Sequence, residues 1–195
     1  MRSLFVGALF AMVAMTATAE DTYKGYEMPP FEVVEARAEY ELRDYAPHVL
    51  ATVEVPGDAR SSASRGFRTL AGYIFGGNTA GKKIAMTVPV TQVPSTGGYA
   101  ISFMMPAQYD IDALPVPKSG EITFHRTEAE RLAVRTFSGY ANTATLKRRA
   151  AELRYLLQRD GVTIVAGPRY AYYDDPFTLP WRRRNEVAFV VSDER

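Results

Sequence analysis

The sequence predicts an α+β domain made of two similar halves, each a small antiparallel sheet with one helix laid across it. Several short runs alternate apolar and other residues with a period of two, which is typical of half-buried strands. Two longer segments repeat apolar residues at steps of four, three and four, which is typical of helices. The halves recur at a nearly constant distance, because Gly57 and Gly139 are 82 positions apart and Ala63 and Leu146 are 83 apart. This spacing indicates an internal duplication.

The first nineteen residues have the pattern of a cleavable secretory signal. Arg2 precedes an apolar run over residues 4–15, and small residues follow at 17–19, which is the order that a signal peptidase recognises. The run is shorter than the roughly 20 residues that a membrane-spanning helix needs, so a membrane anchor is the weaker interpretation. We expect cleavage before Glu20, a periplasmic or secreted protein, and one domain over residues 20–195 without a membrane span.

The composition restricts the classes of function. Without the signal and its Arg2, the chain has 22 basic and 22 acidic residues, so it is formally neutral and nothing suggests a nucleic-acid partner. The absence of Cys excludes disulfides and thiolate metal sites, and two His leave little room for a multi-His metal site. An apolar content of 47% with 12% aromatic residues is a globular composition, so stability must come from packing.

The first half is predicted to contain a clear strand and a helix among further strands. The strand alternates Val49, Ala51, Val53 and Val55 before Pro56-Gly57. The helix places Ala63, Phe67, Leu70 and Ile74 on one face, and Gly76-Gly77 end it. The flanking strand-like runs are residues 31–45, 83–93 and 99–105.

The second half repeats this order. A short apolar strand, residues 132–137, ends at Gly139, and a helix follows that stops at Asp160-Gly161. Its predicted apolar face consists of Leu146, Ala150, Leu153 and Leu157. The other strand-like runs are residues 121–126, 162–173 and 186–191, and the Pro-rich residues 114–117 join the two halves. Pairing the halves leaves a groove between helices and sheet.

Motifs of common enzymes are missing. The sequence has no phosphate-binding glycine loop, no nucleophile elbow and no paired metal-ligand spacing, so standard hydrolase and nucleotide-binding functions lose support. Asp174-Asp175-Pro176 could be a carboxylate pair, but Asp before Pro more often forms a turn. His48 and His125 fit either ordinary strand or surface positions or the role of an axial iron ligand.

Residues 170–186 combine aromatic and basic side chains. Aromatic rings can stack on a flat apolar ligand while Arg side chains pair with carboxylates at its edge, and a porphyrin has that shape. Alternatively, Tyr173 and Phe177 belong to the core and some of the arginines pair with Glu186. The candidate ligand-binding residues in this segment are Tyr172, Phe177, Trp181, Arg182 and Glu186.

Several ordered motifs together resemble one family. They are Tyr40-Glu41-Leu42-Arg43-Asp44-Tyr45, Gly66-Phe67 with Leu70 and Tyr73-Ile74, Gly77-Asn78, the run Lys83 to Val90, Phe103-Met104-Met105-Pro106, Tyr173-Asp174-Asp175-Pro176-Phe177-Thr178 and Arg183-Arg184-Asn185-Glu186-Val187. From about Tyr26 to Val191 the chain resembles the SOUL haem-binding protein family. The resemblance implies a duplicated strand-helix-strand-strand fold that forms a distorted antiparallel β-barrel with two helices, and no enzyme chemistry.

For some members, the resemblance also implies that haem or another tetrapyrrole binds in an apolar cleft beside the first helix. Carried to this sequence, the cleft positions on that helix are Ser64, Phe67, Ala71 and Gly72, with the loop from Tyr172 to Trp181 opposite. The family's occasional His would fall on Ala46. His48 lies two residues later, on the same face of a strand, and is a candidate iron ligand.

Three functions follow from these expectations. The first is an exported protein that holds haem or a related tetrapyrrole reversibly. The second is a pocket for another small apolar or cationic ligand, as in the GyrI-like effector-binding domains, with Glu186 as a central unpaired acid. The third is a hydrolase or tetrapyrrole-modifying enzyme that uses Glu186 and a neighbouring Tyr. Pairing of Glu186 with Arg43, Arg183 or Arg184 would weaken the second and third.

Overall fold

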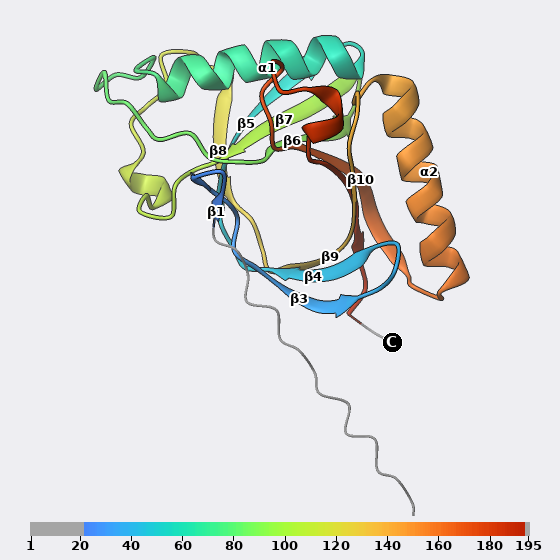
Figure 1. The fold of residues 1–195 in the computed structure, drawn as a ribbon. Helices are drawn as coiled ribbons and strands as arrows, with labels where there is room; N and C mark the ends of the chain where they lie inside the picture. The colour runs from blue at the N-terminus through green and yellow to red at the C-terminus, as the bar shows by residue number, and fades with distance from the viewer. Residues whose placement is uncertain (1–21, 194–195) are drawn as a thin grey trace, which may run out of the picture.

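The computed structural model describes residues 22–193. A nine-stranded antiparallel sheet curls into an open, distorted barrel, and two helices lie against its outside (Figure 1). The strands follow one another across the sheet in the order β3 (Phe31–Ala36), β4 (Glu41–Tyr45), β9 (Glu130–Phe137), β11 (Asn185–Val191), β10 (Ile164–Tyr172), β6 (Val90–Ser95), β7 (Gly98–Met104), β5 (Val49–Pro56) and β8 (Ile122–Arg126). A small separate hairpin pairs β1 (Thr22–Tyr23) with β2 (Tyr26–Glu27). The α+β class and the barrel-like sheet are as predicted.

The first helix, α1 (Ala59–Ile74), lies across β5 and β7. Its start is fixed by Asp58, whose carboxylate accepts hydrogen bonds from the backbone N–H groups of Arg60 and Ser61, because those donors have no partner inside the helix. Beyond its end, Gly76 adopts a φ of 108°, which favours glycine. The predicted alternation of β5 is confirmed: Val49, Ala51, Val53 and Val55 are all buried, in the cluster that contains residues of α1.

The predicted buried face of α1 is only half right. Leu70 and Ile74 are buried, but Phe67 is 41% exposed and Ala63 is only partly buried. Ser62 and Gly66 face the sheet instead. The reason is steric: a Cβ on Gly66 would lie 2.5 Å from the side chain of Ile101. Glycine lets the helix approach β7 closely, and this rotates the bulky Phe67 toward the surface.

The second helix, α2 (Thr143–Arg159), packs on β10 and β11. Its cap is Asn142, which accepts a hydrogen bond from the backbone N–H of Thr145, and Gly161 follows its end with a φ of 71°. Every residue of its predicted face is buried, and Leu156 joins them. These residues are Leu146, Ala150, Leu153 and Leu157.

Three predicted strand runs need correction. The run 83–93 becomes a strand only at Val90, since Pro89 has no N–H with which to extend the ladder. The run 31–45 folds into the hairpin of β3 and β4 rather than one strand. The strand β8, expected to open the second half, pairs with β5 of the first half.

Each half has the predicted order of strand, helix, strand and strand, as β5-α1-β6-β7 and β9-α2-β10-β11. The two halves meet where β10 pairs with β6. Short 3-10 turns, η1 (Ile111–Ala113) and η2 (Pro180–Arg182), lie in the long connections. The internal duplication stays a prediction from the sequence spacing. Within residues 22–193, no helix has the length and apolar character needed to cross a membrane.

Candidate functional site

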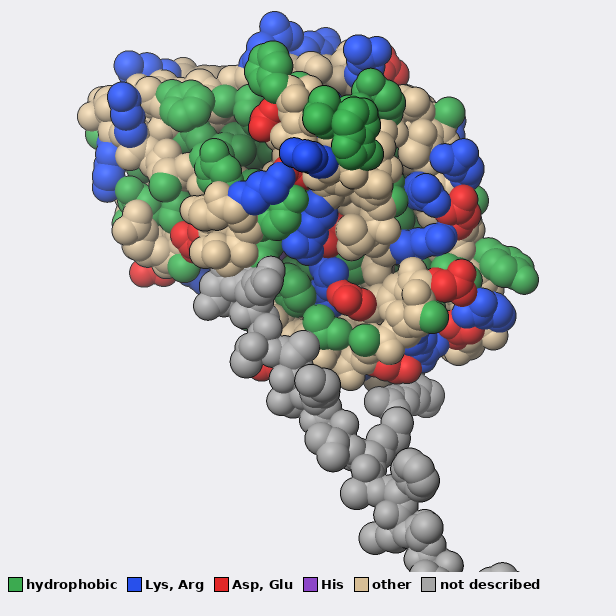
Figure 2. Space-filling model, viewed as in Figure 1, with side chains coloured by type: hydrophobic (Ala, Val, Ile, Leu, Met, Phe, Trp, Pro, Cys, Tyr) green, Lys and Arg blue, Asp and Glu red, His purple; other side chains and the backbone are tan. Residues whose placement is uncertain are grey.

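Hydrophobic side chains gather in a hollow below α1 and beside the loop that contains η2 (Figure 2). The exposed large hydrophobic residues of these two segments are Phe67 and Phe75 from α1 and its end, and Phe177, Leu179 and Trp181 from the loop. Behind these segments, the buried Gln92 of β6 links the start of α1 to the end of β10: its side-chain amide donates to the carbonyl of Ala59 at 2.7 Å, and its oxygen accepts from the Tyr172 hydroxyl at 2.5 Å. We take this hollow as the candidate ligand site.

The helix side of the hollow is formed by small residues and one large apolar residue. Phe67 is partly exposed and packs edge-on against Phe103, with 5.5 Å between ring centroids. Ser64 and Gly72 are exposed, whereas Ala71 is 8% exposed and packs into the core. No side-chain atom lies within 4 Å of the position that a Cβ on Gly72 would take. The small residues leave room beside the Phe67 ring.

The loop side begins with a turn rather than a carboxylate pair. The Asp175 carboxylate accepts hydrogen bonds from the backbone N–H groups of Phe177 at 2.7 Å and Thr178 at 2.9 Å. These bonds hold the pKa of Asp175 below its usual value. Asp174 accepts instead from the backbone N–H of Arg184 at 2.7 Å. The turn interpretation is therefore confirmed.

The three consecutive arginines have three different roles. Arg183 donates to the loop carbonyls of Thr178 at 2.8 Å and Pro176 at 2.7 Å. Arg184 turns inward, where its guanidinium stacks 4.1 Å from the centroid of the Tyr173 ring. Arg182 is exposed and forms no ion pair with any residue between 22 and 193. Among the three, only Arg182 can offer its guanidinium to a ligand without giving up a partner.

Glu186 is buried and fully paired, with 3% of its surface exposed. One carboxylate oxygen accepts from Arg43 at 3.1 Å and from Arg184 at 2.7 Å, and the other accepts from the Tyr173 hydroxyl at 2.8 Å. Burial alone would raise the pKa of Glu186, but the two guanidinium groups outweigh it and hold that pKa below its usual range. Burial and the neighbouring carboxylate in turn raise the pKa of the Tyr173 hydroxyl, so it donates as a neutral phenol.

The two histidines lie on the other face of the sheet. Both line a groove of about 430 Å³ on the concave side of the barrel, together with Leu50 and Thr52 of β5. Since residues 49, 51, 53 and 55 of that strand face α1, the alternating residues must face away from it. The His48 Nδ1 lies 2.9 Å from the Ala46 carbonyl, and burial lowers its pKa.

The concave groove is polar and was not predicted as a unit. Glu130 and Arg169 face each other across it in a two-pronged ion pair with N···O distances of 2.6 Å and 3.1 Å. The hydroxyls of Thr52 and Ser102 are hydrogen-bonded at 2.8 Å. Among residues 22–193, no group of three or more His, Cys, Asp or Glu side chains could hold a metal ion. The alternation along β5 could have predicted which residues of that strand face the groove, because every second residue points away from α1.

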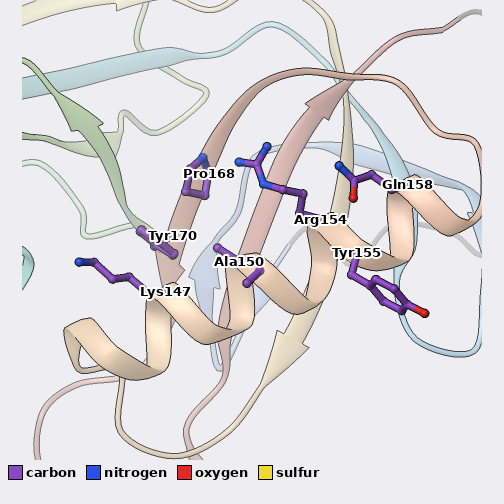
Figure 3. A pocket seen from close by; sticks show the side chains of 8 residues that line it. Lys147, Ala150, Arg154, Tyr155, Gln158, Pro168 and Tyr170 are labelled. Atoms are coloured by element: carbon purple, nitrogen blue, oxygen red, sulfur yellow. The ribbon is translucent and has the colours of Figure 1, made fainter.

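A further depression, of about 320 Å³, lies between α2 and β10 (Figure 3). Its floor is formed by Ala150 of the helix and Tyr170 of the strand, with the side chains of Lys147 and Arg154 beside it. Arg154 is held there by stacking on Phe189, 4.9 Å from the ring centroid. The residues that line the depression include no acidic side chain, and no sequence pattern predicted it.

The predicted site residues thus lie in several different places. The exposed ones are Ser64, Phe67 and Gly72 on α1 and Phe177, Trp181 and Arg182 on the loop. Ala71 is buried in the core between α1 and the sheet, and Tyr172, at the end of β10, is partly buried against the core under α2. Glu186 sits inside the sheet, held by Arg43 and Arg184. His48 lies on the concave face, so it does not share a cleft with the residues of α1.

The protein is thus a small α+β domain. It consists of an open antiparallel barrel with one helix outside each half, and an apolar hollow lies beside the first helix. The chain belongs to the SOUL heme-binding protein family, whose model matches residues 26–190. The family predicted from the sequence motifs is confirmed.

Curated relatives are about 30% identical to this chain over most of its length. The chain is 29% identical to heme-binding protein 2 of Homo sapiens over 164 residues, which is 80% of this chain and 79% of the relative. It is 32% identical to heme-binding protein 1 of Sus scrofa over 163 residues, which is 78% of this chain and 84% of the relative.

Solved structures share the fold at much lower identity. The C-terminal domain of EcmrR matches with a TM-score of 0.62 and 13% identity, over 79% of this chain and 97% of that domain. A hydrolase from Listeria innocua matches with a TM-score of 0.54 and 12% identity, over 82% of this chain and 94% of that protein. These matches show the fold alone.

Proposed function

We propose that this protein is an exported binding protein that holds haem or a related tetrapyrrole reversibly in the hollow between α1 and the η2 loop. The observation that carries the proposal is the apolar hollow in a chain of the SOUL heme-binding protein family. Relatives named heme-binding protein 1 and 2 align with about four fifths of the chain. Export is supported by the signal pattern of residues 1–19, which lie outside the described residues.

The side chains around the hollow fit a flat apolar ligand with acidic groups at its edge. Phe67 and Trp181 offer partly exposed ring surface, which stacks well on an extended aromatic system. Arg182 offers an unpaired guanidinium that suits a carboxylate. Because Ser64 and Gly72 are small, the ligand can approach the helix closely.

The alternative functions depended on an unpaired Glu186. A carboxylate that already binds two guanidinium groups has no need of a cationic ligand. The same pairing holds its pKa low, which does not suit a proton donor near neutral pH. Neither the cation-binding pocket nor the enzyme that uses Glu186 gains support from this arrangement.

The proposal is tested by titrating the purified protein, without residues 1–19, with haemin and following the Soret band. We expect a saturable shift at micromolar haemin together with quenching of Trp181, the single tryptophan of the chain. Phe67→Asp should weaken binding by about tenfold or more, because it places a charge against the apolar ligand. Tyr155→Asp is the matched control, since Tyr155 is an exposed aromatic residue on α2.

The His48→Ala variant separates two locations for the ligand. If haem lies beside α1, the spectrum of this variant should equal that of the unchanged protein, since His48 is on the opposite face of β5. Loss of the Soret shift in His48→Ala, with Phe67→Asp unaffected, would place haem in the concave groove instead. Absence of any saturable shift would falsify the proposed function.

A further inference from the structure

Three large hydrophobic residues protrude from one short loop. Phe177 is 93% exposed, Trp181 is 68% exposed and Leu179, between them, is 46% exposed. Single exposed hydrophobic residues are common on protein surfaces, whereas a cluster of large ones marks an interaction surface. We call Phe177, Leu179 and Trp181 the apolar tip.

Hydrogen bonds within the loop hold the apolar tip in place, so its exposure follows from the fold. The Asp175 carboxylate binds the backbone at Phe177 and Thr178, and Arg183 binds the carbonyls of Pro176 and Thr178. On the far side of the tip, the backbone N–H of Gly139 donates to the Pro180 carbonyl at 2.8 Å. Polar contacts therefore hold the loop while its apolar side chains point into solvent.

The surroundings of the apolar tip are basic. Residues 174–185 contain three arginines and two aspartates, and both aspartates already have partners: Asp175 in the loop backbone and Asp174 in Lys24. Residues 59–109, which include α1 and the segment after it, contain five basic residues and no acidic residue, although the whole chain carries 23 basic and 22 acidic residues. Arg60 and Arg68 on α1 are exposed. Lys and Arg side chains flank the hydrophobic group in Figure 2.

We propose that the apolar tip and the basic residues around it form a docking surface for a membrane that contains anionic phospholipids. Aromatic and leucine side chains enter the boundary between headgroups and acyl chains, and flanking Arg and Lys bind the lipid phosphates. The surface is monotopic: the chain binds to one leaflet. Docking does not depend on haem binding.

The single tryptophan makes the proposal directly testable, because Trp181 lies in the apolar tip. Haem-free protein is mixed with vesicles of phosphatidylcholine alone or of equal parts phosphatidylcholine and phosphatidylglycerol. With the anionic vesicles, we expect Trp181 emission to shift to shorter wavelength and to be quenched by brominated acyl chains. High salt should weaken binding, since it screens the cations from the phosphates.

Substitutions identify the surface. In a vesicle flotation assay, the double variant Phe177→Ser with Trp181→Ser should bind anionic vesicles at least about tenfold more weakly. The reason is that each ring removed from the lipid loses apolar burial. Arg182→Glu should lower the salt-sensitive part of binding. Tyr155→Ser, at an exposed aromatic residue on α2, is the matched control and should bind as the unchanged protein does.

Two results would overturn the proposal. One is Trp181 emission that stays unchanged at saturating anionic lipid. The other is a self-association in sedimentation experiments that the double variant abolishes, without vesicle binding, because the apolar tip would then contact a second copy of the chain. Haemin binding is measured separately by the Soret band, so failure of one proposal does not decide the other.

Discussion

Glu186 is the residue whose role changed most between sequence and structure. The sequence placed it in an aromatic and basic segment and left open whether it faced a ligand or a partner. Arg43, which lies 143 positions earlier in the chain, reaches it from β4 across the curled sheet. A carboxylate so placed is structural, since removing it would take away the acidic partner of Arg184 and leave the buried Arg43 with only the more exposed Glu41.

We therefore expect Glu186→Gln to lower the free energy of unfolding by about 3–5 kcal/mol, because Arg43 is 4% exposed and would lose its buried counter-charge. Urea unfolding followed by circular dichroism measures the change. Glu152→Gln, at a carboxylate on α2 whose side chain is 34% exposed, is the control and should cost under about 1 kcal/mol. Equal losses in both variants would contradict the buried role of Glu186.

The same variant should change the response to acid. In the folded protein the pKa of Glu186 lies below its usual value of 4.5, so the folded state binds its proton less readily than the unfolded state does. The stability from this group is present above that usual value and is lost as the pH falls through the folded-state pKa. Stability measured below pH 4.5 should thus fall less steeply in Glu186→Gln than in the unchanged protein.

At the scale of elements, the two helices differ in how well periodicity predicts their buried face. The four residues predicted for α2 are all buried, because leucines dominate that face and its one small residue, Ala150, lies on the same face as they do. In α1, Gly66 and Ser62 allow a closer approach to β7 than Phe67 would. Hydrophobicity alone cannot detect a face selected for small size, since glycine adds no apolar signal.

Two glycines of α1 give opposite predictions for the same substitution. Gly66→Ala should destabilise the protein by about 1–3 kcal/mol, because the new Cβ would meet Ile101 at 2.5 Å and the core must shift. Gly72→Ala should stabilise it by about 0.5–1 kcal/mol, since open space surrounds Gly72 and alanine favours the helix. Thermal unfolding of both variants checks the pair. A loss of stability in Gly72→Ala equal to that in Gly66→Ala would disprove the close approach.

At the scale of the whole molecule, the curled sheet separates two surfaces that share strand β5. Its buried apolar residues support α1 and the hollow, and its alternate residues line the polar groove with both histidines. A ligand beside α1 and a ligand in the groove would therefore not touch each other. The hollow and the apolar tip lie on one side of this division, so the proposed ligand site and the proposed docking surface share a face.

Export is the remaining prediction for the whole chain. Mass spectrometry of the protein recovered from the periplasm or medium of an expressing bacterium should give the mass of a chain that begins at Glu20, because the small residues at 17–19 suit signal peptidase. Ala19→Arg, which replaces the small residue next to the predicted cut, should block processing. Recovery of the unchanged protein with Met1 in place would contradict the prediction.

The amino-acid sequence by itself determined the strand and helix order, the ends of the helices just before Gly76 and Asp160, and the family, because periodicity and short motifs depend on neighbours in the chain. The tertiary structure alone decided which face of α1 is buried, how Glu186 is paired, and that His48 lies across the sheet from Phe67. Each of these depends on contacts between residues far apart in sequence, where sterics and burial of charge outweigh local preference.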